Sequence, residues 1–266
     1  MSVATSGAER IAAAFAGHGR RAALMPYLMG GFPDVEGSAA IGEAYADAGA
    51  DLVELGVPYS DPLADGPVIQ AAGSAALRAG ATVEGVLGVG ERLAPRLPVI
   101  LMCYANLVFA RGAGRFTQDL ADRGISGLIV PDLPLEEAPA LLEAGDAAGV
   151  ALVPLVAPTT PDDRLAAIGS RARGFLYTVS VTGTTGERSG LDDAMARVIA
   201  RARAHTEVPV ALGFGIGTPE QAVEAAEAGA EGVIVGSRLV RAASEAADPP
   251  AAVREVVGAM AAALSY

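Results

Sequence analysis

A glutamate interrupts an apolar run in DLVELGVPYSDPLADGP, residues 51–67, and aspartates follow it closely. A carboxylate in apolar surroundings is costly to bury unless something retains it. Such surroundings raise the pKa of Glu54, which suits an acid/base that gives and takes a proton near neutrality. Asp65, in the long loop that follows, is the preferred second carboxylate, although Asp61 and Asp65 could each be turn residues. The alternative for Glu54 is a strand-end glutamate paired with an arginine.

Glycine-rich turns near the C-terminal end could bind an anion. LGFGIGTPEQ (212–221) and VIVGSRL (233–239) each place glycine, then a small or hydroxyl residue, before an expected helix. Backbone N–H groups at a helix N-terminus bind phosphate without any net positive charge. The predicted phosphate contacts are Gly186, Gly215, Ile216, Gly236 and Ser237. The alternative is that these glycines only permit tight turns.

The segment SVTGTTGERSGL, residues 180–191, is small and polar, with glycines on both sides of Thr184 and Thr185. This composition predicts a lid whose closure would exclude water from a site. A plain connector is the alternative.

Composition excludes several kinds of chemistry. All 19 basic residues are arginine, so no lysine can form a Schiff base with a substrate or with pyridoxal phosphate. With 2 histidines, His18 and His205, a histidine-rich metal site cannot be assembled, and we expect no metal. The net charge of −12 argues against nucleic acid or an anionic membrane as the main partner. The single cysteine, Cys103, lies in an apolar segment and is expected to fill the core.

Short apolar runs alternate with amphipathic stretches along the whole chain. A helix-like stretch, a glycine and then an apolar run recur, as in AYADAGADLVELGV and EAAEAGAEGVIVGS, which is typical of a helix-to-strand junction. Eight runs are candidate strands: 22–29, 52–57, 98–105, 127–130, 151–157, 174–180, 209–214 and 232–237. Helices are expected between them, for example at 36–49, 83–96, 135–147, 191–204 and 219–229. This alternation predicts an α/β fold, a single (β/α)8 TIM barrel spanning residues 1–266.

An extra helix at 8–17 precedes the first strand and is expected to cap the barrel floor. The alternative fold is an open doubly wound sheet, but MGGFPD after the first strand does not match its G-x-G-x-x-G fingerprint. No apolar run is long enough to span a bilayer and no signal peptide is evident, so we expect a soluble, cytoplasmic protein.

The barrel prediction locates the site. Active sites of such barrels lie at the carboxyl ends of the strands, and strand residues alternate between the interior and the helix layer. If Val53 and Leu55 face the helices, Glu54 faces the interior near the catalytic mouth. The loops after the seventh and eighth strands commonly form the phosphate site.

The chain resembles the α subunit of tryptophan synthase over essentially its whole length. The resemblance rests on ELGVPYSDPLADGPVIQ (54–70), MCYANLVF (102–109), LIVPDLPLEE (128–137), SVTGTTG (180–186), GFGIGTPEQ (213–221) and VIVGS (233–237), in the family's order. The first of these motifs is highly specific to the family, whereas the glycine loops alone would be weak evidence for it. The resemblance implies retro-aldol cleavage of indole-3-glycerol phosphate to indole and glyceraldehyde 3-phosphate, a lyase reaction that needs no Schiff base.

The resemblance also implies residue roles. Glu54 matches the general acid/base that protonates the indole C3 and handles the C3′ hydroxyl proton. Asp65 matches the carboxylate that binds the indole N–H, and we expect the two sites to push the carboxyl pKa values apart. The remaining pocket residues are Tyr27, which would line the indole pocket, Tyr177, near the reacting end, Thr185, the lid threonine, and Phe214.

The implied partner is a β subunit in an assembly of two α and two β chains. Pyridoxal phosphate would belong to that partner, and this chain would carry no cofactor. The implied docking face is formed by Pro58 to Pro62 and the segment around Asn106. Two alternatives stay open: a phosphosugar isomerase barrel, which needs a different catalytic pair, and a non-catalytic scaffold that activates a partner.

Overall fold

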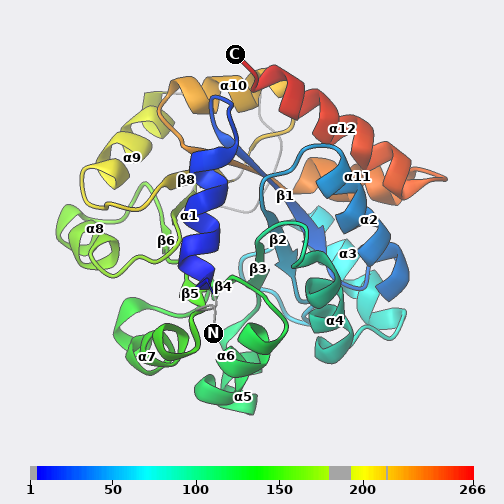
Figure 1. Cartoon of the computed structure of the whole chain (residues 1–266), viewed down its shortest axis with the longest axis horizontal. Helices are drawn as coiled ribbons and strands as arrows, with labels where there is room; N and C mark the ends of the chain where they lie inside the picture. The colour runs from blue at the N-terminus through cyan, green and yellow to red at the C-terminus, as the bar shows by residue number, and fades with distance from the viewer. Residues whose placement is uncertain (1–4, 180–192, 214) are drawn as a thin grey trace.

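The computed structural model describes residues 5–179, 193–213 and 215–266, and its strands form one curled parallel sheet (Figure 1). The strands are β1 Ala23–Met29, β2 Val53–Gly56, β3 Val99–Met102, β4 Gly127–Ile129, β5 Ala151–Leu152, β6 Leu155–Val156, β7 Leu176–Val179, β8 Val210–Gly213 and β9 Gly232–Val235. Each lies at a predicted position, with β5 and β6 sharing the fifth. The sheet order is β5-β4-β3-β2-β1-β9-β8-β7-β6.

The fifth strand is divided at a proline, and this division closes the barrel. Pro154 has no N–H to donate, so the ladder is interrupted between β5 and β6. The Val153 N–H bonds to the Leu128 carbonyl at 2.9 Å, whereas the Pro154 carbonyl accepts from the Tyr177 N–H at 3.0 Å. The two outer strands of the sheet order are therefore one strand that pairs with β4 on one side and β7 on the other. The predicted (β/α)8 barrel is confirmed.

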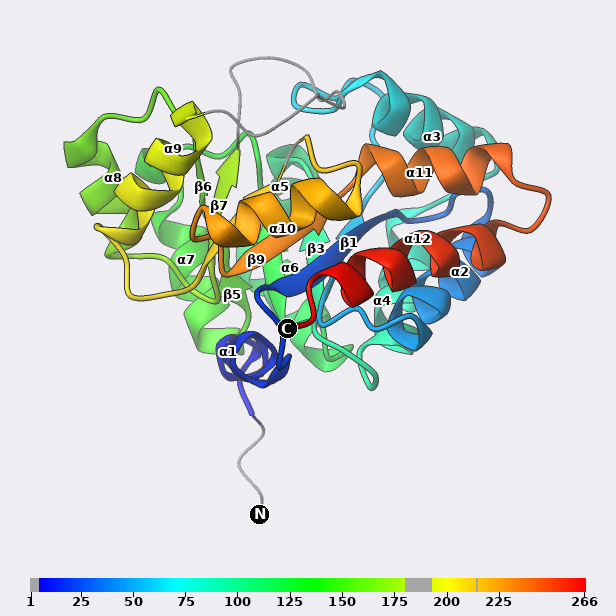
Figure 2. The same ribbon diagram turned by 90° about the horizontal axis from the view of Figure 1, so that it is seen from above.

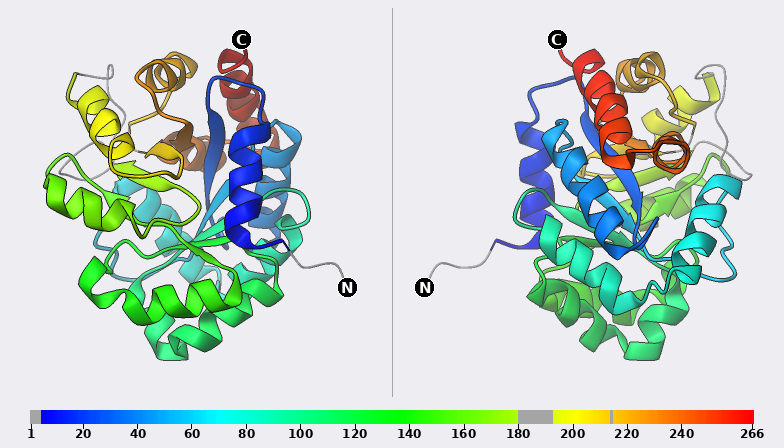
Figure 3. Two further views of the ribbon diagram at one scale, coloured as in Figure 1. Left: turned by 60° about the vertical axis from the view of Figure 1, so that its left-hand side comes forward. Right: turned by 90° about the vertical axis from the view of Figure 1, so that its right-hand side faces the viewer.

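Helices surround the sheet (Figures 1 and 3). The described helices are α1 Gly7–Gly17, α2 Val35–Asp47, α3 Pro67–Arg78, α4 Val83–Leu93, α5 Ala105–Arg111, α6 Ala113–Asp122, η1 Leu135–Glu137, α7 Pro139–Ala148, α8 Asp162–Gly169, α9 Asp193–Arg203, α10 Pro219–Glu227, α11 Ser237–Glu245 and α12 Pro249–Ala263. The expected helices are present within a few residues, except that the one at 135–147 begins with the 3-10 turn η1. None of the described helices is long and apolar enough to cross a membrane.

Left-handed glycines join helices to strands, as the recurring phrase predicts. Gly49, Gly124, Gly149 and Gly229 have φ values of 96°, 72°, 75° and 99°. A side chain at such a φ would be strained, so glycine allows each helix to end abruptly before the next strand. These junctions keep the connections at the floor of the barrel short.

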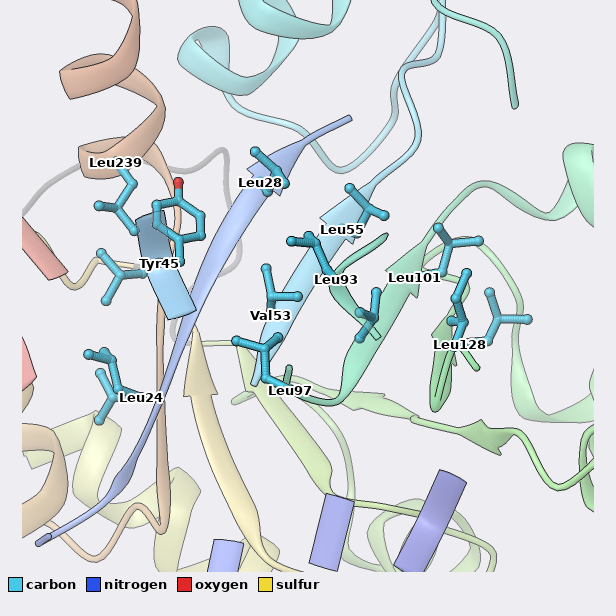
Figure 4. Close-up of a cluster of buried hydrophobic side chains, with 14 of the residues drawn as sticks. Leu24, Leu28, Tyr45, Val53, Leu55, Leu93, Leu97, Leu101, Leu128 and Leu239 are labelled. Atoms are coloured by element: carbon cyan, nitrogen blue, oxygen red, sulfur yellow. The ribbon is translucent and has the colours of Figure 1, made fainter. Parts of the chain in front are cut away.

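The apolar core has two layers. Between sheet and helices, side chains of the strands such as Val53, Leu55 and Leu101 form one cluster with Leu93 and Leu97 (Figure 4). The barrel interior is filled by a second cluster with side chains from β1, β3, β4, β5, β7, β8 and β9, from Leu52 just before β2, and from Leu155 of β6, which packs against it. The alternation of side chains along a strand decides which of its residues can reach the site.

The N-terminal helix closes one end of the barrel (Figure 2). Ile11 and Phe15 of α1 join the interior cluster, which confirms the predicted cap on the floor. Arg10 fixes the helix from outside, because its guanidinium donates to the Gly124 carbonyl at 2.6 Å and to a carbonyl after α4. The opposite end is left for the site.

Candidate active site

A pocket opens at the carboxyl ends of the strands. Six of the residues predicted for the site line it: Tyr27, Glu54, Asp65, Tyr177, Gly236 and Ser237. The apolar part of the wall is formed by Ile69, Met102, Leu155 and Ile234. A flat apolar ring would therefore be enclosed beside two carboxyl groups.

Strand alternation places Glu54 in this pocket. On β2 its neighbours Val53 and Leu55 belong to the outer core, so Glu54 faces the interior. In register it lies beside Tyr27 of β1 and Ile100 of β3, and the residue is 2% exposed. The inward orientation predicted from the sequence is confirmed.

The surroundings of Glu54 favour its protonated form. Burial and, to a smaller extent, the charge of Asp65 raise the pKa of Glu54 to about 8, although a hydrogen bond with the Tyr177 hydroxyl acts in the opposite direction. Its Oε2 atom is buried without a hydrogen-bond partner among the described residues. A buried polar atom normally finds a partner, so this oxygen is free to meet a substrate.

Two tyrosines reach the pocket because glycines lie on neighbouring strands. A Cβ atom at Gly56 would lie 2.1 Å from the Tyr27 hydroxyl oxygen. A Cβ atom at Gly213 would lie 2.2 to 2.5 Å from atoms of the Tyr177 ring and its hydroxyl. Each ring thus occupies the space that a side chain on the next strand would fill. This packing holds Tyr177 against Glu54.

Asp65 lies in the loop between β2 and α3, and Tyr104 is its neighbour from the next βα unit. Burial raises the pKa of Asp65, and a hydrogen bond with the Tyr104 hydroxyl opposes this shift. The expected separation of the two carboxyl pKa values is therefore incomplete, because burial raises both of them. Sequence reasoning missed Tyr104 as a site residue, although MCYANLVF had identified its segment.

The start of α11 lies at the pocket with its first turn uncapped. Gly236 is the N-cap and makes no side-chain capping bond, and both Gly236 and Ser237 line the pocket. By contrast, the amides of Gly217 and Thr218 before α10 already donate to the Gln221 side chain at 2.7 and 3.1 Å. Free amides and the helix dipole make the α11 start the better anion site.

Two further predicted site residues do not line this pocket. Gly215 and Ile216 follow β8 and are not among the residues that line it. Thr185, Gly186 and Phe214, together with the predicted lid at 180–191, lie outside the described residues. Within the described part of the chain, no group of His, Cys, Asp and Glu side chains could hold a metal ion.

The fold and this pocket define a class, a (β/α)8-barrel enzyme with two carboxyl groups in a pocket at the carboxyl ends of its strands. Residues 14–264 match the family model described as tryptophan synthase alpha chain. The tryptophan synthase alpha chain of Prochlorococcus marinus is 51% identical over 229 residues, covering 85% of this chain and 83% of the relative. The alpha chain of Gloeobacter violaceus is 50% identical over 242 residues, covering 90% and 88%.

Solved structures agree with these relatives. A chain of Mycobacterium tuberculosis tryptophan synthase superimposes with a TM-score of 0.90 at 38% identity, covering 98% of this chain and 99% of that one. A chain of the tryptophan synthase α2β2 complex of Pyrococcus furiosus gives 0.85 at 34% identity, covering 90% and 97%. The chain belongs to the tryptophan synthase alpha chain family, the lyases of tryptophan biosynthesis.

Proposed function

We propose that the pocket cleaves indole-3-glycerol phosphate by a retro-aldol reaction, with Glu54 as the acid/base. The observation that carries this assignment is a buried carboxyl group, one oxygen of which has no hydrogen-bond partner among the described residues, in a pocket that also contains a helix N-terminus without a side-chain cap. One substrate would satisfy both features if it joined an apolar ring to a phosphate. Indole-3-glycerol phosphate is such a molecule.

Cleavage requires indole to leave as a neutral molecule, so its C3 atom must first gain a proton. A carboxyl group whose pKa is about 8 is largely protonated at neutral pH and can donate that proton. The C3′ hydroxyl then loses its proton to the Glu54 carboxylate, and its oxygen forms the aldehyde carbonyl. The C3–C3′ bond breaks as its electron pair returns to the indole ring, which gives indole and glyceraldehyde 3-phosphate.

Asp65 supports the charged intermediate in this proposal. Protonation at C3 leaves positive charge on the indole nitrogen, which an ionised carboxylate would stabilise through the N–H. Tyr177 holds Glu54 through its hydrogen bond, and Tyr27 lines the ring pocket beside it. Gly236 and Ser237 would bind the phosphate at the start of α11.

The residues outside the pocket lining keep proposed roles from the family resemblance. Gly186, Gly215 and Ile216 would complete the phosphate site, Phe214 would line the substrate pocket, and Thr185 would contact Asp65 from a closed lid. These roles are testable by single substitutions that leave Glu54 intact.

A β subunit is the proposed partner, as in the α2β2 complex of Pyrococcus furiosus. The segments after β2 and β3, proposed as the docking face, expose Leu63 of the first loop at 81% and Phe109 of α5 at 53%. The Asn106 side chain joins these segments through a 3.0 Å bond to the Tyr59 hydroxyl. Pyridoxal phosphate would be held by the partner, since this chain has no lysine. We also propose a cytoplasmic location, which the biosynthetic role of the family supports.

Mixing the purified chain with indole-3-glycerol phosphate, with and without a β subunit, tests the proposal directly. Indole should be released in both cases. Glu54→Gln should keep the fold and the phosphate affinity but lose at least about a hundredfold in kcat, because amide cannot transfer the proton. Asp65→Asn should also lower kcat strongly. Full activity in Glu54→Gln would refute the acid/base role, and lack of indole from the wild-type chain would favour a scaffold.

A further inference from the structure

Tyr104, the N-cap residue of α5 just after β3, contacts the loop between β2 and α3. Its hydroxyl oxygen accepts the Ala64 N–H at 3.0 Å. The next residue of that loop is Asp65, whose carboxylate shares a hydrogen bond with the same hydroxyl. Because the phenol oxygen accepts from the backbone amide, its own proton is available to the carboxylate. The residue is 3% exposed, so water competes little for this contact.

The backbone on both sides of Tyr104 is fixed. The Cys103 N–H donates to the Ile129 carbonyl at 3.1 Å, and the Ala105 N–H donates to Asp132 Oδ1 at 2.9 Å. The Tyr104 ring also packs on Tyr59, with ring centroids 5.0 Å apart. A donor held this firmly can position a loop residue that it contacts.

We propose that Tyr104 is a positioning residue for the reaction, whose hydroxyl holds the Asp65 carboxylate ionised and in place for the substrate. This inference rests on the proposed role of Asp65. Without the donor, Asp65 would be left in a partly buried site with no described cation beside it. The titratable groups that face it are Glu54 from β2, Tyr27 from β1 and Tyr104 itself.

The direction of the effect follows from this arrangement. Burial favours the neutral form of Asp65, and the hydrogen bond from Tyr104 favours the ionised form. Removing the hydroxyl should therefore raise the pKa of Asp65 and move the acidic limb of the kcat profile to higher pH. The loop would also lose the hydrogen bond at the Ala64 N–H, so the Asp65 carboxylate would adopt more orientations.

Tyr104→Phe tests the inference in the full-length chain, with indole release measured from pH 5 to 9. We expect kcat to fall about tenfold or more, as for a lost hydrogen bond to a charged group, with KM little changed. The acidic limb should shift upward. Wild-type kcat and an unshifted limb in Tyr104→Phe would overturn the inference.

Tyr45→Phe is the matched control for a general loss of packing or stability. Tyr45 is buried, and its hydroxyl donates to the Tyr27 carbonyl at 3.0 Å, away from any carboxylate. This variant should lower the melting temperature but leave the acidic limb where the wild type has it. A limb that moved equally in both variants would show a merely structural effect and overturn the inference.

A double mutant separates this inference from the proposed function. Tyr104→Phe added to Asp65→Asn should cost no further activity if Tyr104 acts through Asp65. If Asp65→Asn alone keeps full turnover, the proposed role of Asp65 fails. If Asp65→Asn loses turnover while Tyr104→Phe does not, the role of Asp65 stands and the positioning inference fails.

Discussion

At the scale of single residues, the site depends on a carboxyl group whose buried surroundings disfavour its ionised form. Glu54 is 2% exposed and has one oxygen without a described partner. A surface position would be less costly for the fold but would return its pKa to the ordinary range, where it could not donate a proton at neutral pH. Reactivity and stability are therefore opposed at this residue.

Glu54→Gln should stabilise the protein, and increasingly so as the pH rises. The pKa of Glu54 is about 8 in the folded chain and near 4.5 for the free side chain. Between these values the folded state keeps a proton that the unfolded state releases, so wild-type stability falls with rising pH. The gain on substitution should be small below pH 4.5 and reach roughly 3 to 5 kcal/mol above pH 8.

Urea unfolding at pH 5 and pH 8.5 measures this difference. Glu143→Gln, at an exposed position of α7, serves as the control and should show little change with pH. A Glu54→Gln variant that gained no more stability at pH 8.5 than at pH 5 would contradict the buried, protonated carboxyl group.

At the scale of elements, the described helices differ in how their N-termini are capped. α10 is closed by its own Thr218 and Gln221 side chains, whereas α11 begins at Gly236 without a side-chain cap. An uncapped start costs some helix stability but leaves amides free for a ligand. The α11 start lies at the pocket, so the stability lost there coincides with the predicted phosphate site.

Ser237→Asp should separate stability from binding at this helix. The new carboxylate would interact favourably with the start of α11 and stabilise it by about 0.3 to 1 kcal/mol. It would also repel the substrate phosphate, so KM should rise at least about tenfold. Ser237→Asn, of similar size but uncharged, is the control and should raise KM far less. Melting temperatures and KM for indole release measure both effects, and an unchanged KM in Ser237→Asp would contradict the phosphate site.

Sequence patterns predicted the elements well and their contacts less well. The periodicity of β2 was enough to orient Glu54 inward, because alternation is a local property. The hydrogen bond between Tyr104 and Asp65 was not predictable in this way, since it depends on how two βα loops fold over each other. The different capping of α10 and α11 was not predicted either, because both starts carry glycine, although Thr218 and Gln221 match the capping-box pattern.

At the scale of the whole molecule, α1 is packed into the floor of the barrel that carries the site. Its side chains fill the barrel interior, while the outer core runs from Ala22 to Leu264. Because this outer cluster takes side chains from nearly the whole described length of the chain, we expect the chain to unfold as one domain.

Ile11→Ala tests that expectation. Ile11 is 0% exposed, and removing its buried methyl groups should cost about 2 to 5 kcal/mol. α1 closes the floor of the same barrel that carries the site. The substitution should therefore lower the melting temperature of a single unfolding transition and not create a second transition. Thermal unfolding followed by far-ultraviolet circular dichroism should coincide with the loss of indole release. Two separate transitions would contradict a single domain.

The rings of Tyr27 and Tyr177 each occupy the place of a missing side chain, at Gly56 and at Gly213. These positions are coupled during evolution, because a larger residue at either glycine would force the paired tyrosine ring to move or to be replaced by a smaller residue. A relative that had acquired a side chain at either glycine would thereby reveal a reshaped pocket. The residues at these two glycine–tyrosine pairs would therefore indicate which substrates the pocket of a related barrel could accept.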